Sequence, residues 1–259
     1  MKYFVIDVFT DRLFGGNPAG VCLLDSWPDD AVMQNIAMEN NLAETAFLVR
    51  EDESAYGLRW FTPEVEIDLC GHATLASAFV LMNEVHAVSG TVNFHTQSGT
   101  LTVIQSGDIF TMDFPSRAPV PCDVPPLLEQ ALGVSVLETH MSRDLLVLLD
   151  SEDTVRNLQP DYALLQKFDN VFAIIVTSKG TSCDFVSRFF APNAGISEDP
   201  VTGSSHCTLI PFWAGRLGKA QMTARQLSAR GGSLLCEDCG ERVKIGGRAT
   251  CYLRGEISL

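Results

Sequence analysis

The sequence predicts an α+β protein with two pseudo-symmetric lobes, each a curved, mostly antiparallel sheet wrapped round a central helix. Two observations support this prediction. An ordered set of motifs occurs twice along the chain, and each copy contains a helix that is apolar on nearly all sides. Because a helix without a polar face has to be enclosed by other elements, a strongly curved sheet is its simplest surrounding.

The duplication is visible in motifs that recur in the same order. Arg59-Trp60-Phe61-Thr62-Pro63 leads through an acidic loop to Gly71, and Arg188-Phe189-Phe190-Ala191-Pro192 leads in the same way to Gly203. The next matching glycine, Gly99 or Gly232, follows after 28 positions in the first copy and 29 in the second. The recurrence of several features in order indicates an internal repeat.

Hydrophobic periodicity and turn residues predict the elements of the first half. A helix begins at Asp29 or Asp30 and ends at Asn40-Asn41, residues that accept left-handed backbone angles. The central helix is expected at 72–85. The expected strands are 3–9, 19–24, 42–49, 56–61, 91–94, 101–105 and 109–114.

The second half is predicted by the same signals. The central helix is expected at 204–217 and a short helix at 162–167. The expected strands are 145–149, 172–177, 184–190, 222–227, 233–236, 242–245 and 249–257. A proline-dense stretch suggests a linker at 116–126 between lobes at 1–115 and 127–259, and the last strand is a candidate to cross back to the first lobe.

Composition limits the partners that the chain can have. It is 46% hydrophobic and 19% charged, which is typical of globular proteins. A net charge of −14 argues against binding to nucleic acid or anionic membranes. Asp7 interrupts the only apolar run near the N-terminus, and no run reaches membrane-spanning length, so we expect a cytoplasmic protein.

The eight cysteines are scattered through apolar segments and are expected to be reduced core thiols. Cys236 and Cys239 form a CxxC motif without a second pair. A zinc site needs about four ligands, so no metal is expected there.

Carboxylates near helix starts are the candidate functional groups. Glu198 and Asp199 precede the helix that begins near Gly203 and Ser204, and a helix start offers backbone N–H groups to a carboxylate or phosphate. The alternative is that these acids only complement the helix dipole. Glu44 enters an apolar strand directly after a helix, where it is either a partly desolvated acid/base or a solvated loop residue. The repeat would bring two helix starts to one cleft, which favours a site.

Several motifs resemble the PhzF-like phenazine-biosynthesis isomerase family, and the likeness covers essentially the whole chain. They are Asp7-Val8-Phe9-Thr10, Gly16-Asn17-Pro18-Ala19, Leu42-Ala43-Glu44-Thr45-Ala46-Phe47, Cys70-Gly71-His72-Ala73-Thr74, the run from Glu198 to Ser204, Arg230-Gly231-Gly232 and Val243-Lys244-Ile245. The resemblance implies the diaminopimelate-epimerase-like fold, a homodimer, and no metal or organic cofactor. The family's characterised reaction isomerises trans-2,3-dihydro-3-hydroxyanthranilate by moving a proton between ring carbons.

The same resemblance suggests roles for individual residues. Glu44 aligns with the family's acid/base glutamate, and His72 and Asp199 with its substrate-positioning groups. The substrate-binding candidates are Asn17 in the early loop and the two helix starts, Gly71 with Ala73 and Gly203 with Ser204. The implied substrate is a small anion, because backbone N–H groups at those helix starts can hold a carboxylate or an enolate.

Related racemases and epimerases on this fold use one cysteine from each half. Cys70 occupies the place of the first thiol, but Pro200-Val201-Thr202 precedes Gly203 without a cysteine. Inversion by two thiols is therefore disfavoured, and Cys70 is expected to be a packed thiol. Two alternatives stay open: an epimerase that uses Glu44 and His72 on opposite faces of its substrate, and a non-enzymatic binding protein on the same scaffold.

Overall fold

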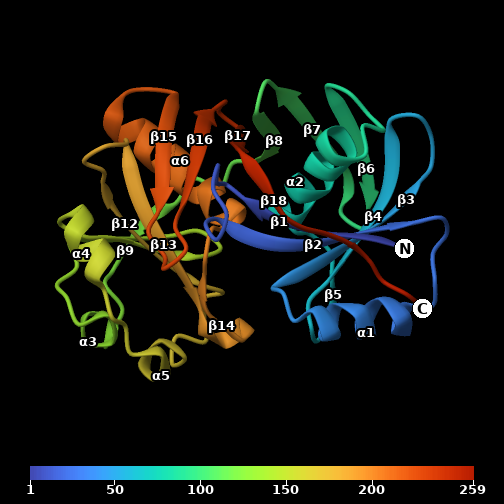
Figure 1. Cartoon of the computed structure of the whole chain (residues 1–259). Coiled ribbons are helices and arrows are strands. Elements are labelled where there is room, and N and C mark those ends of the chain that lie inside the picture. Colours follow the sequence, from blue (N-terminus) through green and yellow to red (C-terminus); the bar gives the residue numbers. More distant parts are fainter. The chain divides into compact units, whose positions relative to one another are not determined.

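The computed structural model describes all residues from Met1 to Leu259. The chain forms two compact units (Figure 1). The first unit consists of Met1–Asp113 together with Gly246–Leu259, and the second consists of Phe114–Ile245. Each unit combines a mixed sheet with few helices, which confirms the predicted α+β class.

The first unit is built on a sheet in the order β18, β1, β2, β3, β4, β6, β7, β8. Neighbouring strands are antiparallel except for the pairs β2–β3 and β4–β6. The elements are β1 (Lys2–Val8), β2 (Asn17–Leu24), α1 (Asp30–Asn40), β3 (Glu44–Arg50), β4 (Ala55–Phe61), β5 (Glu66–Ile67), α2 (Gly71–Phe79), the π-helix η1 (Val80–Glu84), β6 (Thr91–Thr96), β7 (Gly99–Ser106), β8 (Ile109–Pro115) and β18 (Ala249–Glu256).

Helix α2 is the centre of the first unit. All its residues from His72 to Phe79 are buried. It packs against β1, β2 and β3 and also against β7 and β18, which lie near opposite ends of the sheet order. Because strands near both ends of the sheet contact α2, the sheet curls round the helix. This enclosure covers the apolar surface of α2.

Helix α1 ends where the sequence predicted. Its C-cap, Asn41, has a left-handed backbone with φ 49°, and its N–H donates to the carbonyl of Ala37. The buried face of α1 includes Met33 and Ile36, which belong to a hydrophobic cluster with Phe47. Because α1 ends at Asn41, β3 begins shortly afterwards, with Glu44 as its first residue.

The second unit contains a sheet in the order β9, β10, β11, β12, β13, β15, β16. Its elements are β9 (Val120–Cys122), α3 (Leu128–Leu132), β10 (Glu138–Met141), β11 (Leu145–Leu148), α4 (Glu152–Asn157), α5 (Tyr162–Leu165), β12 (Ile174–Lys179), β13 (Phe185–Ala191), the 3-10 helix η2 (Pro192–Ala194), β14 (Ile196–Asp199), α6 (Gly203–Leu217), β15 (Gln221–Gln226), β16 (Gly232–Asp238) and β17 (Arg242–Gly247).

Strand pairing repeats between the two units. In the first, β3 is antiparallel to β4, β4 is parallel to β6, and β6 is antiparallel to β7. In the second, β12, β13, β15 and β16 follow the same scheme. Helices α2 and α6 occupy equivalent places in this order, so the duplicated motifs fold into duplicated structure.

The proline-dense stretch 116–126 includes an ordered strand. Strand β9 pairs with β10, and Pro121 lies within it opposite His140. Proline is tolerated on an edge strand because its missing N–H removes no internal ladder bond. The backbone N–H of Arg117 also donates to the carbonyl of Cys207, which ties this stretch to α6.

None of the helices is both long enough and apolar enough to cross a membrane.

A bidentate ion pair braces each copy of the repeat, more deeply buried in the second copy than in the first. Arg188 on β13 donates from Nε and Nη2 to the two carboxylate oxygens of Glu198 on β14, at 2.7 and 2.9 Å. Its Nη1 donates to the carbonyls of Val155 and Leu158. Arg59 on β4 forms the equivalent fork with Glu66 on β5, at 2.7 Å for both bonds.

We predict that Arg188→Met destabilises the protein by about 3–5 kcal/mol, because it leaves the Glu198 carboxylate and two carbonyls without their buried donor. Urea unfolding of the variant and the wild type measures this loss. Arg248→Met is the control, since the Arg248–Asp108 pair is exposed on both sides and its loss should barely move the midpoint. Equal effects of the two substitutions would contradict the bracing role.

His206 lies in the core of the second unit. It is fully buried, its Nδ1–H donates to the carbonyl of Thr202 at 2.8 Å, and its ring lies 5.9 Å from that of Phe185. Burial disfavours the imidazolium and lowers the pKa of His206 to about 4, although the bond to Thr202 opposes the shift. His206 is therefore a neutral packing residue.

A neutral buried histidine makes stability depend on pH. Because the folded pKa of His206 lies below the unfolded value near 6.5, its contribution is present above about pH 6.5 and is lost as the pH falls towards 4. We expect about 3 kcal/mol of wild-type stability to disappear over this window. His206→Asn should remove that part of the slope in a series of urea titrations. An unchanged slope would show that His206 does not titrate on unfolding.

Candidate functional site

Asn17 is the first residue of β2, directly after the loop that follows β1. It pairs with Val8 in the ladder and is fully buried. Gly16 before it has φ +63°, and a Cβ there would lie 2.0 Å from the carbonyl oxygen of Val8. Only glycine therefore fits this position. The loop directs the Asn17 amide nitrogen to within 3.5 Å of His72 Nδ1.

Glu44 and His72 form the centre of the candidate site in the first unit. Parallel pairing of β2 and β3 sets Glu44 beside Ala19, and His72 lies in the first turn of α2. Glu44 Oε2 lies 3.2 Å from His72 Nε2, and both side chains are largely buried, with 12% and 8% exposed. The two atoms are not aligned as a hydrogen bond and have no other hydrogen-bond partner. Catalytic groups without substrate often show such long or poorly aligned contacts.

Cys70 completes this cluster from the N-cap position of α2. Its side chain does not cap the helix, and Sγ lies 3.5 Å from His72 Nδ1. Its carbonyl accepts bonds from the N–H and the hydroxyl of Thr74. Burial and then the charge of Glu44 raise the pKa of Cys70, so it is a neutral thiol at neutral pH. A packed thiol was expected, but its contact with His72 was not.

The charge state of His72 follows from opposing effects. Burial acts to lower its pKa, but the neighbouring Cys70 and Glu44 outweigh burial and hold the pKa well above the ordinary value. Cys70 and Glu44 are thus the neighbours that favour the protonated form of His72, at a site with little water around it.

Asp199 lies in the second unit at the end of β14. Thr202 Oγ1 donates to its carboxylate at 2.5 Å. Gln226 on β15 is fully buried and joins the two: its Nε2 donates to the Asp199 carbonyl, and its Oε1 accepts the Thr202 N–H. Sequence analysis missed Gln226, since nothing in its local pattern distinguishes it from other strand residues.

The side chain of Arg143 contacts the start of α6, and sequence analysis also missed this residue. Arg143 Nη2 donates to Ser204 Oγ at 3.3 Å, and its guanidinium lies 4.6 Å from the centre of the Phe172 ring. Two further bonds, of 2.8 and 2.9 Å, run from Arg143 to Asp144, which is fully buried. Gly203 is buried, and an added Cβ there would meet nothing within 4 Å, so there is free space beside its Cα.

The structure thus brings together some of the predicted residues within each unit. Asn17, Glu44 and His72 are neighbours in the first, where Gly71 and Ala73 start α2. The Ala73 N–H faces the sulfur of Cys70, which acts to lower the thiol pKa. In the second unit, Asp199 ends β14 just before α6, and Gly203 and Ser204 are the first two residues of α6.

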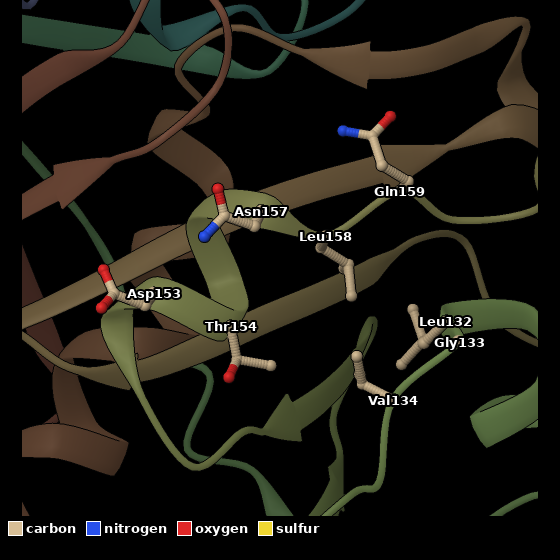
Figure 2. Close-up of a pocket in the computed structure, with 8 residues that line it drawn as sticks. All are labelled: Leu132, Gly133, Val134, Asp153, Thr154, Asn157, Leu158 and Gln159. Carbon is tan, nitrogen blue, oxygen red and sulfur yellow. The ribbon is translucent and has the colours of Figure 1, made fainter.

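A pocket of about 460 Å³ lies elsewhere in the second unit (Figure 2). Its apolar part is formed by Leu132 at the end of α3, Val134 just after α3, and Leu158, while Asp153 and Asn157 come from α4. It contains none of the predicted site residues and none of the clustered groups described above.

Comparison with known proteins agrees with the resemblance seen in the sequence. The family model for phenazine biosynthesis-like proteins, PhzC-PhzF, matches residues 6–255. An uncharacterized isomerase of Pseudomonas aeruginosa is 50% identical over 259 residues, covering 100% of this chain and 99% of the relative. The human phenazine biosynthesis-like domain-containing protein is 39% identical over 285 residues, covering 100% and 99%.

Solved structures show the same relationship. A phenazine biosynthesis protein of the PhzF family from Enterococcus faecalis has 48% identity and a TM-score of 0.97, covering 100% of this chain and 99% of that one. A hydroxyproline epimerase from Agrobacterium vitis has 10% identity and a TM-score of 0.64 over 98% of this chain and 91% of its own, a likeness of fold alone. The match of sequence and structure over nearly the whole length shows that this chain belongs to the PhzC-PhzF family of phenazine biosynthesis-like proteins.

Proposed function

We propose that the protein is a cofactor-independent isomerase that moves a proton on a small carboxylate-bearing substrate, with Glu44 as the single acid/base. The observation that carries this proposal is the buried contact of 3.2 Å between Glu44 and His72 at the start of α2. The reaction would be similar to that of trans-2,3-dihydro-3-hydroxyanthranilate isomerase.

The charge balance of the pair supports proton transfer. In the proposed mechanism, the Glu44 carboxylate and the His72 imidazolium, 3.2 Å apart, neutralise each other before reaction. When Glu44 takes a proton from a substrate carbon, the positive charge of His72 is no longer compensated. It then stabilises the negative charge that develops on the substrate, in surroundings where water screens little. Glu44 returns the proton to another carbon on the same face, and the double bond shifts between them.

The geometry disfavours an epimerase that uses Glu44 and His72 on opposite faces of a carbon. Each group would have to lie about 3–3.5 Å from that carbon, so the two would stand roughly 6 Å apart. Their reactive atoms are only 3.2 Å apart. The two-thiol route also lacks its second cysteine, because Thr202 stands at the N-cap of α6.

The second unit is proposed to contribute Asp199, Gly203 and Ser204 to substrate binding, together with Arg143. In a chain with a net charge of −14, an anion needs local positive charge. The Arg143 guanidinium and the first turn of α6 supply it side by side. The buried Asp144 fixes the orientation of the guanidinium through two bonds.

We predict that Glu44→Gln abolishes the exchange of the transferable proton with solvent. Removal of a general base lowers the rate by roughly 10²-fold or more. The measurement is deuterium uptake into hydroxyanthranilate-like compounds and small amino acids, followed by NMR. Glu39→Gln, the same change at an exposed position on α1, is the matched control and should keep the wild-type rate. Exchange in Glu44→Gln at the rate of the control would remove Glu44 from its role, and no exchange with any compound would favour a binding protein.

Arg143 should act mainly on substrate binding. We expect Arg143→Met to raise KM for the substrate found in that screen by about 10-fold, the effect of about 1.4 kcal/mol of lost binding, with kcat largely retained. Asp144→Asn tests the orienting bonds while the cation is kept, and should raise KM less. Thermal unfolding of both variants controls for the loss of the buried pair. An unchanged KM in Arg143→Met would exclude Arg143 from binding the carboxylate.

A further inference from the structure

Three side chains of the first unit that are known metal ligands lie close together. The ligand atoms of Glu44, Cys70 and His72 all lie within 4.8 Å of one another. They come from two rigid elements, the first residue of β3 and the start of α2. Cys70 and His72 are buried, and Glu44 is only 12% exposed.

The spacing suits a tetrahedral ion such as Zn²⁺. Its ligands lie at about 2.0–2.3 Å from the metal, so two ligands of one ion are roughly 3.3–3.8 Å apart. Cys70 Sγ is 3.5 Å from His72 Nδ1, and Glu44 Oε2 is 3.2 Å from His72 Nε2. These two contacts involve different imidazole nitrogens, and one ion binds only one of them. One ligand atom from each of the three residues lies within 4.8 Å of the other two.

The cluster also has unused capacity for bonding. Glu44 Oε2 and His72 Nε2 are buried, and apart from the 3.2 Å contact between them neither has a hydrogen-bond partner. Buried polar atoms are nearly always paired, so such atoms call for a ligand. An ion that binds both would satisfy them at once.

We propose that Glu44, Cys70 and one nitrogen of His72 form a binding site for a thiophilic divalent cation, Zn²⁺ or Cd²⁺, and that occupancy of this site inhibits the enzyme. The inhibition rests on the proposed function, because the ion takes the carboxylate lone pair that Glu44 needs as a base. Binding displaces the thiol proton of Cys70 and one imidazolium proton of His72 to solvent, with no change of oxidation state. The thiolate selects Zn²⁺ and Cd²⁺ over Mg²⁺ and Ca²⁺.

Cadmium is the direct probe, because a cadmium–thiolate bond has an ultraviolet charge-transfer band. Titration of the full-length protein with Cd²⁺ should produce this band with one equivalent per chain, and excess Mg²⁺ should not prevent it. The band should be absent in Cys70→Ser. It should persist in Cys239→Ser, which removes the exposed thiol of the only CxxC motif. A band that survives in Cys70→Ser, disappears in Cys239→Ser, or never forms in the wild type overturns the proposal.

A second pair of variants guards against misfolding of Cys70→Ser. His72→Asn and Glu44→Gln keep the thiol but remove one ligand each, and each should weaken Cd²⁺ binding by at least about 10-fold. Circular dichroism establishes that each variant is folded. Unchanged affinity in both folded variants would mean that the thiol binds the ion without the cluster, which also overturns the proposal.

The proposed metal site and the proposed isomerase activity can be disproved independently of each other. Zn²⁺ should stop deuterium exchange by the wild type, and a chelator should restore it. If Cd²⁺ binds at Cys70 while Glu44→Gln still exchanges protons, the metal site stands and the proposed acid/base role falls. If Glu44→Gln loses exchange but Cd²⁺ does not bind at Cys70, the reverse holds.

Discussion

The enclosure of an apolar helix is the constraint on which the structure of each unit depends. Helix α2 is buried on every side from His72 to Phe79, and α6 buries most of its length, including Leu209 and Trp213. Burial of apolar surface is the main stabilising force in folding. The sheet of the first unit has to curl until strands near both of its ends touch α2. The first turn of the helix is then where polar side chains such as His72 meet the strands.

Burial also explains the electrostatics of the site. A carboxylate and an imidazole withdrawn from water interact more strongly than they would at the surface. Neighbouring groups raise the pKa of His72 in spite of burial, whereas burial raises the pKa of Cys70, with Glu44 adding to the shift, and burial lowers the pKa of His206. The two histidines at the helix starts thus have opposite shifts. The difference comes from their neighbours: His72 faces Cys70 and the carboxylate of Glu44, whereas His206 faces the carbonyl of Thr202 and an aromatic ring.

The two copies of the repeat share the same Arg–Glu ion pair but differ in the residues at the start of the central helix. The bidentate pair is Arg59–Glu66 in one unit and Arg188–Glu198 in the other, and it fixes the loop before each helix. The helix starts differ: Cys70-Gly71-His72 presents groups that exchange protons, and Thr202-Gly203-Ser204 presents hydroxyls beside the guanidinium of Arg143. The two helix starts therefore offer different chemistry.

The sequence by itself determined the duplication, the α+β class, the end of α1 at Asn41 and the family, because these depend on periodicity, turn residues and ordered motifs that are local in the chain. It also named Glu44 and His72 as candidates. Only the tertiary structure decided that their atoms lie 3.2 Å apart, that Cys70 joins them, and that Arg143 contacts Ser204 from 61 positions away. Such contacts depend on strand register and helix docking over long separations. No local pattern encodes them, since an arginine beside an aspartate looks the same in a sequence whether it is solvated or fixed against a helix start.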